Sequence, residues 1–314
     1  MEFSELACYI SRSDDYERAR KTSQPGYRMI QLMTTEFELS SRFVDLAAPE
    51  PSPNFTEFGK LNALANWLIS TRVTSQVSLS QARELIVFSK ADQVPESIRD
   101  LHGIKISKHA SIVNQGASVA HSIELGIQIA DRAIDSGVTL LFVASDEETR
   151  AHDFEILIGA LTRADAASVA VRTNVGDQEW MNTVIHIRDQ IFAMRDLVAD
   201  PSALLARTNS FDVAAMLGLI LQSSNRATPL VLIGERAYCA ALLAQRISHR
   251  SRDWLIPALD LTSPAGALAQ QRLDRPPILE LAMPFAVDYL SQATLAAPVI
   301  DAMLELLKSN PSTI

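Results

Sequence analysis

One stretch in the second half of the chain has a pattern of apolar and polar positions that predicts a helix, a strand and a second helix. Residues 212–221 carry a broad apolar stripe, which is typical of a helix packed on a sheet. After the polar residues 223–225, the run 230–233 is continuously apolar, as in a parallel strand buried on both faces. Gly234 then precedes a small-residue helix, 238–247. Such units often serve only as scaffold, but ligands bind where the strands of open α/β sheets end.

Similar patterns extend over the rest of the chain. Residues 85–88 and 139–143 predict buried strands, and residues 168–171 are compatible with a short one. Helices are predicted over 55–71, 112–136, 153–162 and 180–197, a loop over 253–266 and a last strand over 278–283. Asp200 and Pro201 predict another helix, with the aspartate as N-cap and the proline in the first turn. Strands that alternate with helices indicate a parallel sheet covered on both faces.

The composition indicates a globular protein without a nucleic-acid or membrane partner. The 314 residues are 47% hydrophobic and 21% charged, and they can bury a large core. The net charge of −9 argues against nucleic-acid binding, which would require clustered Lys and Arg. No apolar run approaches the roughly 20 residues of a membrane span, and the first ten residues do not resemble a signal peptide. We therefore expect a cytoplasmic protein.

Cysteine, histidine and glycine usage limits the chemistry that we expect. The two cysteines, Cys8 and Cys239, fit a reducing compartment, and Cys239 is expected to be a small core residue. The six histidines show no metal-ligand spacing, so we expect neither a metal nor a cofactor. Only 11 glycines are present, although loops that bind phosphate need glycines to bring backbone N–H groups close to the anion.

Several segments nevertheless follow the order of a known family. They are residues 200–201 (Asp-Pro), 210–218 (SFDVAAMLG), 229–234 (PLVLIG) and 240–244 (AALLA), with weaker matches at 23–26 and 87–94. In these segments the chain resembles the nicotinate-nucleotide:dimethylbenzimidazole phosphoribosyltransferase family, which makes the lower-ligand nucleotide of cobalamin. The resemblance implies a three-layer αβα Rossmann-like domain with a parallel sheet, over residues 76–291. It also implies a small helical domain from the two termini, 1–75 and 292–314, and a homodimer with active sites at strand C-termini.

The resemblance also implies a reaction, the transfer of phosphoribose from nicotinate mononucleotide to a nitrogen of an aromatic base. Where the family has the glutamate that takes the base's proton, this chain has Val287, and Asp288 is a weak substitute. A solvated acid at a helix N-terminus is the plainer interpretation of Asp288.

The phosphate-binding loops of the family are also altered in this chain. Its second glycine loop falls on residues 144–150, where three acids replace the glycines and only Ser145 and Arg150 favour an anion. The other candidate binding residues are Gly176, Glu235 and Ser263, which match family contact loops. For Glu235 the plainer interpretation is a surface ion pair with its neighbour Arg236.

Three hypotheses follow from these changes. The first is a catalytically impaired paralogue, which binds a ligand or acts as the partner subunit of an active homologue. The second is a divergent active phosphoribosyltransferase, with Asp288, Glu147 or Glu148 as the base. The third is a purely structural or interaction protein.

Overall fold

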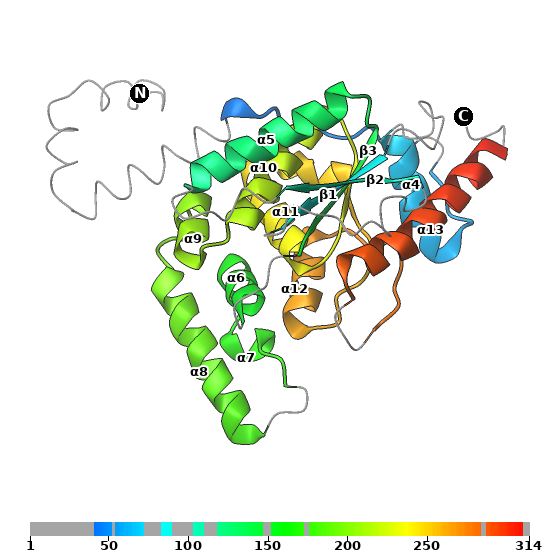
Figure 1. The fold of residues 1–314 in the computed structure, drawn as a ribbon. Helices are drawn as coiled ribbons and strands as arrows, with labels where there is room; N and C mark the ends of the chain where they lie inside the picture. The colour runs from blue at the N-terminus through cyan, green and yellow to red at the C-terminus, as the bar shows by residue number, and fades with distance from the viewer. Residues whose placement is uncertain are drawn as a thin grey trace, which may run out of the picture.

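The computed structural model describes residues 41–51, 54–71, 83–89, 103–109, 118–146, 152–172, 176–283 and 287–309. Its centre is a five-stranded parallel sheet with the strand order β2-β1-β3-β4-β5 (Figure 1). The strands are β1 Arg83–Phe88, β2 Lys105–His109, β3 Leu140–Ser145, β4 Leu230–Leu232 and β5 Leu255–Pro257. All four neighbouring pairs are parallel, as the sequence predicts.

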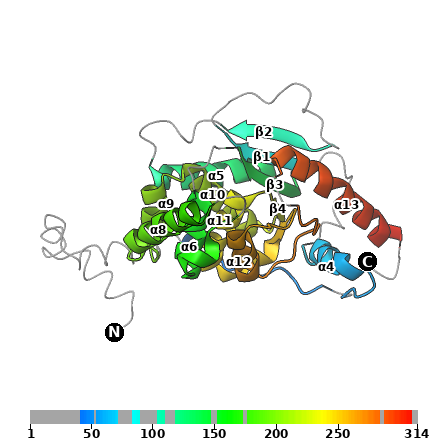
Figure 2. The same ribbon diagram turned by 90° about the horizontal axis from the view of Figure 1, so that it is seen from below.

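Helices cover both faces of the sheet, so the predicted three-layer αβα architecture is confirmed (Figures 1 and 2). One face carries α5 Val119–Asp135, α10 Phe211–Asn225 and α11 Glu235–Ile247, and the other carries α4 Asn62–Ser70 and α13 Tyr289–Ser309. The remaining helices are η1 Gly59–Leu61, α6 Asp153–Thr162, α7 Ala166–Val169, α8 Asp177–Met194, α9 Pro201–Thr208, η5 His249–Trp254 and α12 Pro264–Leu273.

The sheet separates two hydrophobic cores. In β1, Ile86 and Phe88 contribute to the core with α5, α10 and α11, whereas Leu85 and Val87 contribute to the core with α4 and α13. Successive side chains of a strand point to opposite faces, so a strand covered on both faces is apolar over most of its length, with the buried Arg83 and Glu84 at the start of β1 as exceptions. This geometry explains the continuous apolar runs that identify β1, β3 and β4 in the sequence.

Two glycines allow α5 and α10 to pack in direct backbone contact. A Cβ atom added to Gly126 would lie 1.9 Å from the carbonyl oxygen of Ala215. A Cβ atom at Gly218 would lie 2.0 Å from the carbonyl oxygen of Ile123. Both glycines are therefore required by the close approach of the two helices.

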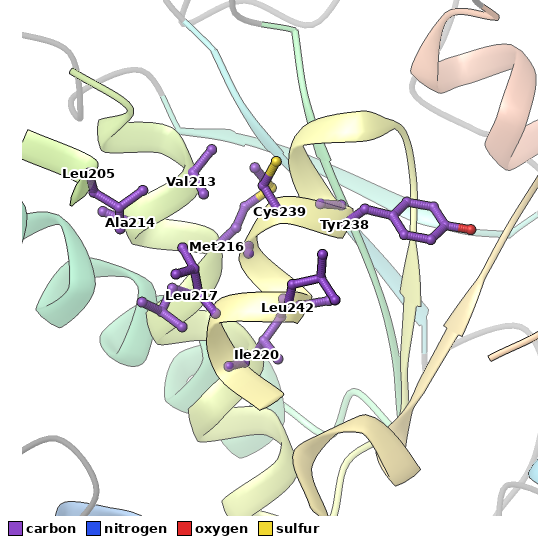
Figure 3. Close-up of a cluster of buried hydrophobic side chains, with 14 of the residues drawn as sticks. Leu205, Val213, Ala214, Met216, Leu217, Ile220, Tyr238, Cys239 and Leu242 are labelled. Carbon is purple, nitrogen blue, oxygen red and sulfur yellow. The ribbon is translucent and has the colours of Figure 1, made fainter. Parts of the chain in front are cut away.

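The helices α10 and α11 pack through small and flexible side chains (Figure 3). Met216 of α10 and Cys239 of α11 lie between the two helices, whereas the ring of Tyr238 points away from α10. Cys239 is 1% exposed, so its prediction as a core residue is confirmed. Burial raises the pKa of its thiol, so this cysteine is not a nucleophile at neutral pH.

Several predicted helix boundaries are wrong for local reasons. The helix predicted over 55–71 begins only at η1 and α4, because Asn66 and Asn62 accept hydrogen bonds from the N–H groups of Phe55 and Phe58. Residues 223–225, where a break was predicted, are still helical. The hydroxyls of Ser223 and Ser224 donate hydrogen bonds to carbonyl groups of the preceding turn, so these polar side chains are satisfied within the helix.

Predicted strand assignments also needed correction. The short strand at 168–171 is wrong, because residues 166–169 form α7. The sequence did not predict β2, nor β5, which lies inside the expected loop 253–266. The last strand predicted over 278–283 is reduced to one bridge between Leu279 and Leu259. Asp260 instead accepts hydrogen bonds from the N–H groups of Leu281 and Ala282, which turns the chain away.

Helix α13 is the one helix in the described residues that is long and apolar enough to cross a membrane. Its apolar side packs in the second core through small and aliphatic residues: Ala293, Ala296, Ala297, Ile300, Met303, Leu304 and Leu307. We therefore describe α13 as a packing helix of this core. The predicted small terminal domain stays a prediction, since residues 1–40 lie outside the described part of the chain.

Candidate functional site

The strand order places the topological switch point between β1 and β3. The chain runs from β1 to β2 on one side, and then to β3 on the other side of β1. In open α/β sheets, ligands bind outside the carboxyl ends of the strands at such a point. Ser89 directly follows β1, and β3 ends at Ser145 and is followed by Asp146. The loops that follow, 90–102 and 147–151, lie outside the described residues.

Glu235 lies at this edge of the sheet, where β4 passes into α11. Gly234 has a φ of +79°, which favours glycine, and it turns the chain so that Glu235 becomes the first residue of α11. Ser263, the N-cap of α12, receives a hydrogen bond from the N–H group of Gly266 and donates one of 3.4 Å to Glu235 Oε1. The structure thus brings together two residues that the sequence predicts for the site.

The environment of Glu235 raises its pKa to about 7. Burial is the largest cause, because it disfavours the ionised carboxylate, and the negative charge of Glu155 adds to it. The hydrogen bond from Ser263 acts in the opposite direction and is weaker. A carboxyl group with this pKa can accept a proton and release it again near neutral pH, which is the requirement for a general base.

A buried ion pair lies next to Glu235 and fixes the adjacent strand ends. Arg236 donates through two nitrogens to both carboxylate oxygens of Asp212, and the Asp212 side chain is only 2% exposed. Ser145 Oγ donates to Asp212 Oδ2 at 2.7 Å. The expected surface pair of Glu235 with Arg236 is therefore wrong, because Arg236 is engaged by α10 instead. Asp212 therefore connects Ser145, at the end of β3, with Arg236, at the start of α11.

A second polar cluster lies on the α13 side of the same edge. The side chain of Lys108 in β2 is 7% exposed, and its Nζ binds Asp146 Oδ2 at 2.9 Å. The same Nζ lies 5.7 Å from the ring centre of Tyr289. Burial lowers the pKa of Lys108, but the bonds to Asp146 and Tyr289 outweigh it and raise the pKa. Lys108 is thus a partly buried cation, paired with Asp146, next to the switch point.

Asp288 serves as the N-terminal cap of α13. Its Oδ1 accepts hydrogen bonds of 3.0 Å from the N–H groups of Leu290 and Ser291, and its Oδ2 accepts one from the Ser291 hydroxyl. Burial acts to raise its pKa, but these hydrogen bonds outweigh burial, and the pKa is lowered. The neighbouring Val287 uses its carbonyl oxygen to accept a 2.7 Å bond from Gln292. Asp288 is therefore held as an ionised cap.

A family model described as phosphoribosyltransferase matches residues 107–312, which is most of the chain. The matched region contains both polar clusters and all of the strand ends from β2 to β5. The chain belongs to the nicotinate-nucleotide–dimethylbenzimidazole phosphoribosyltransferase family.

Curated members of this family from Corynebacterium and Mycobacterium species are similar to this chain over part of their length. The nicotinate-nucleotide–dimethylbenzimidazole phosphoribosyltransferase of Corynebacterium glutamicum (strain R) is 34% identical over 193 residues, which are 60% of this chain and 52% of that protein. The enzyme of the same name from Mycobacterium avium (strain 104) is 32% identical over 189 residues, 60% of this chain and 54% of that protein. The chain therefore spans about half the length of the curated relatives it matches.

A solved structure supports the fold more broadly. The crystal structure of CobT from Thermus thermophilus has a TM-score of 0.62 and covers 88% of this chain and 96% of that chain. Its sequence identity is 18%, so this likeness concerns the fold. The αβα scaffold of the phosphoribosyltransferase family is thus retained over nearly the whole chain.

Of the remaining candidate residues, only Gly176 falls within the described part of the chain. Gly176 is the N-cap of α8, which packs on α6 and α7. Arg150 and the acids Glu147 and Glu148 lie outside the described residues. Within the described part of the chain, no group of three or more His, Cys, Asp or Glu residues could hold a metal ion.

Replacing Asp288 tests whether this residue caps a helix or accepts a proton. We expect Asp288→Ala to lower the free energy of unfolding by about 1 kcal/mol, because the cap is lost, as urea denaturation would measure. Asp288→Asn retains a good capping side chain and removes the carboxylate, so we expect its stability and turnover to stay close to those of the wild type. A large loss of turnover in a stable Asp288→Asn variant would instead identify Asp288 as the base.

Proposed function

We propose that the protein transfers phosphoribose from nicotinate mononucleotide to a ring nitrogen of a benzimidazole-like base, with Glu235 as the proton acceptor. Family membership supports the reaction class, and the names of the relatives supply the two substrates. One observation carries the assignment of the base. Glu235 lies at the carboxyl edge of the sheet, and its carboxyl group has a pKa raised to about 7. Glu235 then takes the role that Val287 cannot perform.

In the proposed reaction, the unprotonated ring nitrogen of the base attacks C1′ of the ribose. The bond from C1′ to the nicotinate nitrogen breaks, and its electron pair leaves with nicotinate. The proton on the other ring nitrogen of the base passes to the Glu235 carboxylate, and solvent then removes it. Proton transfer to a positioned carboxylate contributes roughly 10² to 10⁴ to such a rate.

The other groups at this edge support binding of the anionic donor. Helices α11 and α12 begin here, and the N–H groups of a helix N-terminus favour a phosphate. Lys108, which is partly buried and paired with Asp146, contributes a cation on the α13 side. Ser145 and the pair of Arg236 with Asp212 hold the ends of β3 and β4 in a fixed relation, so that donor and base are presented in one orientation.

A second candidate function is binding without turnover, as a ligand-binding paralogue or as one subunit beside an active homologue. Val287 and the acidic residues between 145 and 150 favour it, since like charges would repel a phosphate there. Under either proposal the protein is expected to act in the cytoplasm as a homodimer or heterodimer.

Turnover by the purified full-length chain distinguishes the two functions. Incubation with nicotinate mononucleotide and 5,6-dimethylbenzimidazole should yield nicotinate and the benzimidazole ribotide in equal amounts, as liquid chromatography would show. Samples without one substrate or without protein serve as controls. If no ribotide forms while nicotinate mononucleotide still raises the melting temperature, catalysis is absent and the binding function is favoured.

A further inference from the structure

A polar cavity lies at the opposite end of α11 from Glu235. It has a volume of about 680 Å³ and is formed where α6, α11 and α12 end, next to η5. Glu235 begins α11 and Arg246 lies in its last turn. With a rise of roughly 1.5 Å per residue, the helix separates Glu235 from Arg246 by about 16 Å. This cavity is therefore distinct from the edge of the sheet where we place the transfer reaction.

The cavity concentrates positive charge in a protein whose net charge is −9. Its lining includes four arginines and a histidine: Arg163, Arg246, Arg252, Arg272 and His249. The lining contains no aspartate or glutamate. The apolar side chains in the lining are Leu161, Val198 and Leu242.

Most of the donors of these arginines are not engaged by carboxylates. Among the described residues, no carboxylate oxygen lies within 4.0 Å of a guanidinium nitrogen of Arg163, Arg246 or Arg272. Arg246 donates one hydrogen bond, of 2.5 Å, to the Val198 carbonyl. Arg252 lies 3.5 Å from Asp274 through one terminal nitrogen and 4.0 Å from Asp253 through Nε, and this buried Nε makes no hydrogen bond. A guanidinium group has five N–H donors, so many remain available to a ligand.

Favourable interaction with a helix dipole explains why each arginine lies at a helix C-terminus, but it does not explain why these arginines surround one cavity. Arg163 follows the last residue of α6, and Arg246 and Arg272 lie in the last turns of α11 and α12. A cation at a helix C-terminus stabilises that helix by about 0.3–1 kcal/mol, wherever the side chain points. Bringing the cations around one cavity opposes this gain, because like charges repel, and solvent moderates this repulsion at the exposed Arg163, Arg246 and Arg272. A bound anion would remove that repulsion.

We propose that this cavity binds a small organic molecule with two linked phosphate groups, such as a nucleoside diphosphate. Planar guanidinium groups bind phosphate oxygens in pairs, so several arginines can hold adjacent phosphates. The volume lies within the range of about 300–1,000 Å³ that is typical of small-ligand sites. The apolar part of the lining then contacts the organic group. The site is independent of the proposed transfer reaction.

Calorimetric titration of the full-length protein with inorganic pyrophosphate and with ADP tests this site. We expect saturable binding of both, tighter for ADP because of the apolar lining, and weaker at higher salt because the contacts are charged. An excess of nicotinate mononucleotide should not displace either ligand. Displacement would place the bound anion at the edge of the sheet and overturn the proposal, as would the absence of saturable binding.

Charge-removing variants identify the residues that bind. The double variant Arg163→Gln with Arg272→Gln should bind pyrophosphate at least tenfold more weakly, whereas Arg188→Gln with Arg195→Gln, which removes two charges from α8 and the residue after it, should bind like the wild type. Melting temperatures without ligand verify that the variants fold. If the double variant does not fold, the single variant Arg246→Gln is tested in its place. Equal affinity in the cavity variants and the control would show that the bound anion is not held by this cavity.

Discussion

Glu235→Gln is expected to lower kcat by at least about a hundredfold, the lower end of what a positioned general base contributes. The amide has the shape of the carboxyl group and can still accept the hydrogen bond from Ser263 Oγ, so the local structure should persist. It cannot accept the proton of the incoming base. Steady-state turnover, measured as release of nicotinate, checks the prediction, with KM for nicotinate mononucleotide expected to change little.

The matched control for Glu235→Gln is Glu155→Gln, a substitution of a nearby acid. Glu155 raises the pKa of Glu235 through its charge, but it has no part in the proposed chemistry. Glu155→Gln should therefore retain turnover at pH 8, where Glu235 is ionised in either protein. If Glu155→Gln and Glu235→Gln lost turnover equally, or if neither did, Glu235 would not be the base.

Gly218→Ala is expected to lower the free energy of unfolding by about 3 kcal/mol, at the upper end of the cost of overpacking a core. The added methyl group would lie 2.0 Å from the carbonyl oxygen of Ile123, far inside van der Waals contact. A backbone atom cannot rotate away as a side chain can, so α5 and α10 must separate along their packed length. Urea denaturation followed by far-UV circular dichroism measures the change.

Gly176→Ala provides the comparison for this helix contact. A Cβ atom at Gly176 would have nothing within 4 Å, and its φ of −69° suits any residue. Its stability should fall by no more than about 1 kcal/mol, because alanine is a poorer N-cap than glycine. Equal stability of Gly218→Ala and Gly176→Ala would mean that α5 and α10 do not pack through Gly218.

The sequence predicted those strands and helices that have a characteristic pattern of apolar residues of their own. Strands β1, β3 and β4 are buried on both faces and read as uninterrupted apolar runs. Strand β2 lies at the edge of the sheet, and its residues, KISKH, carry no such signal. Strand β5 is only three residues long and follows a polar 3-10 helix. Both were missed because pairing with a neighbour, and not their own pattern, defines them.

The candidate site was predictable to a similar extent. Ser145 and Glu235 follow apolar runs, so their position at a strand end can be inferred from the sequence. The contact of Lys108 with Asp146 and Tyr289 could not be predicted, because it joins segments that are far apart in the chain. The ion pair of Arg236 with Asp212 could not be predicted from local sequence either, because a helix and a strand separate the two residues along the chain.

The dependence of kcat/KM on pH tests most directly whether Glu235 accepts the proton. The carboxyl group works only when ionised, so kcat/KM should fall about tenfold per pH unit below its pKa and reach a plateau above it. For the wild type we predict a midpoint near pH 7, which follows from the raised pKa of Glu235. Glu155→Gln should move this midpoint to lower pH, which distinguishes Glu235 from an ionisation of the substrates. A profile that is flat from pH 5 to 8, or a midpoint that Glu155→Gln leaves unchanged, would contradict the assignment of Glu235 as the base.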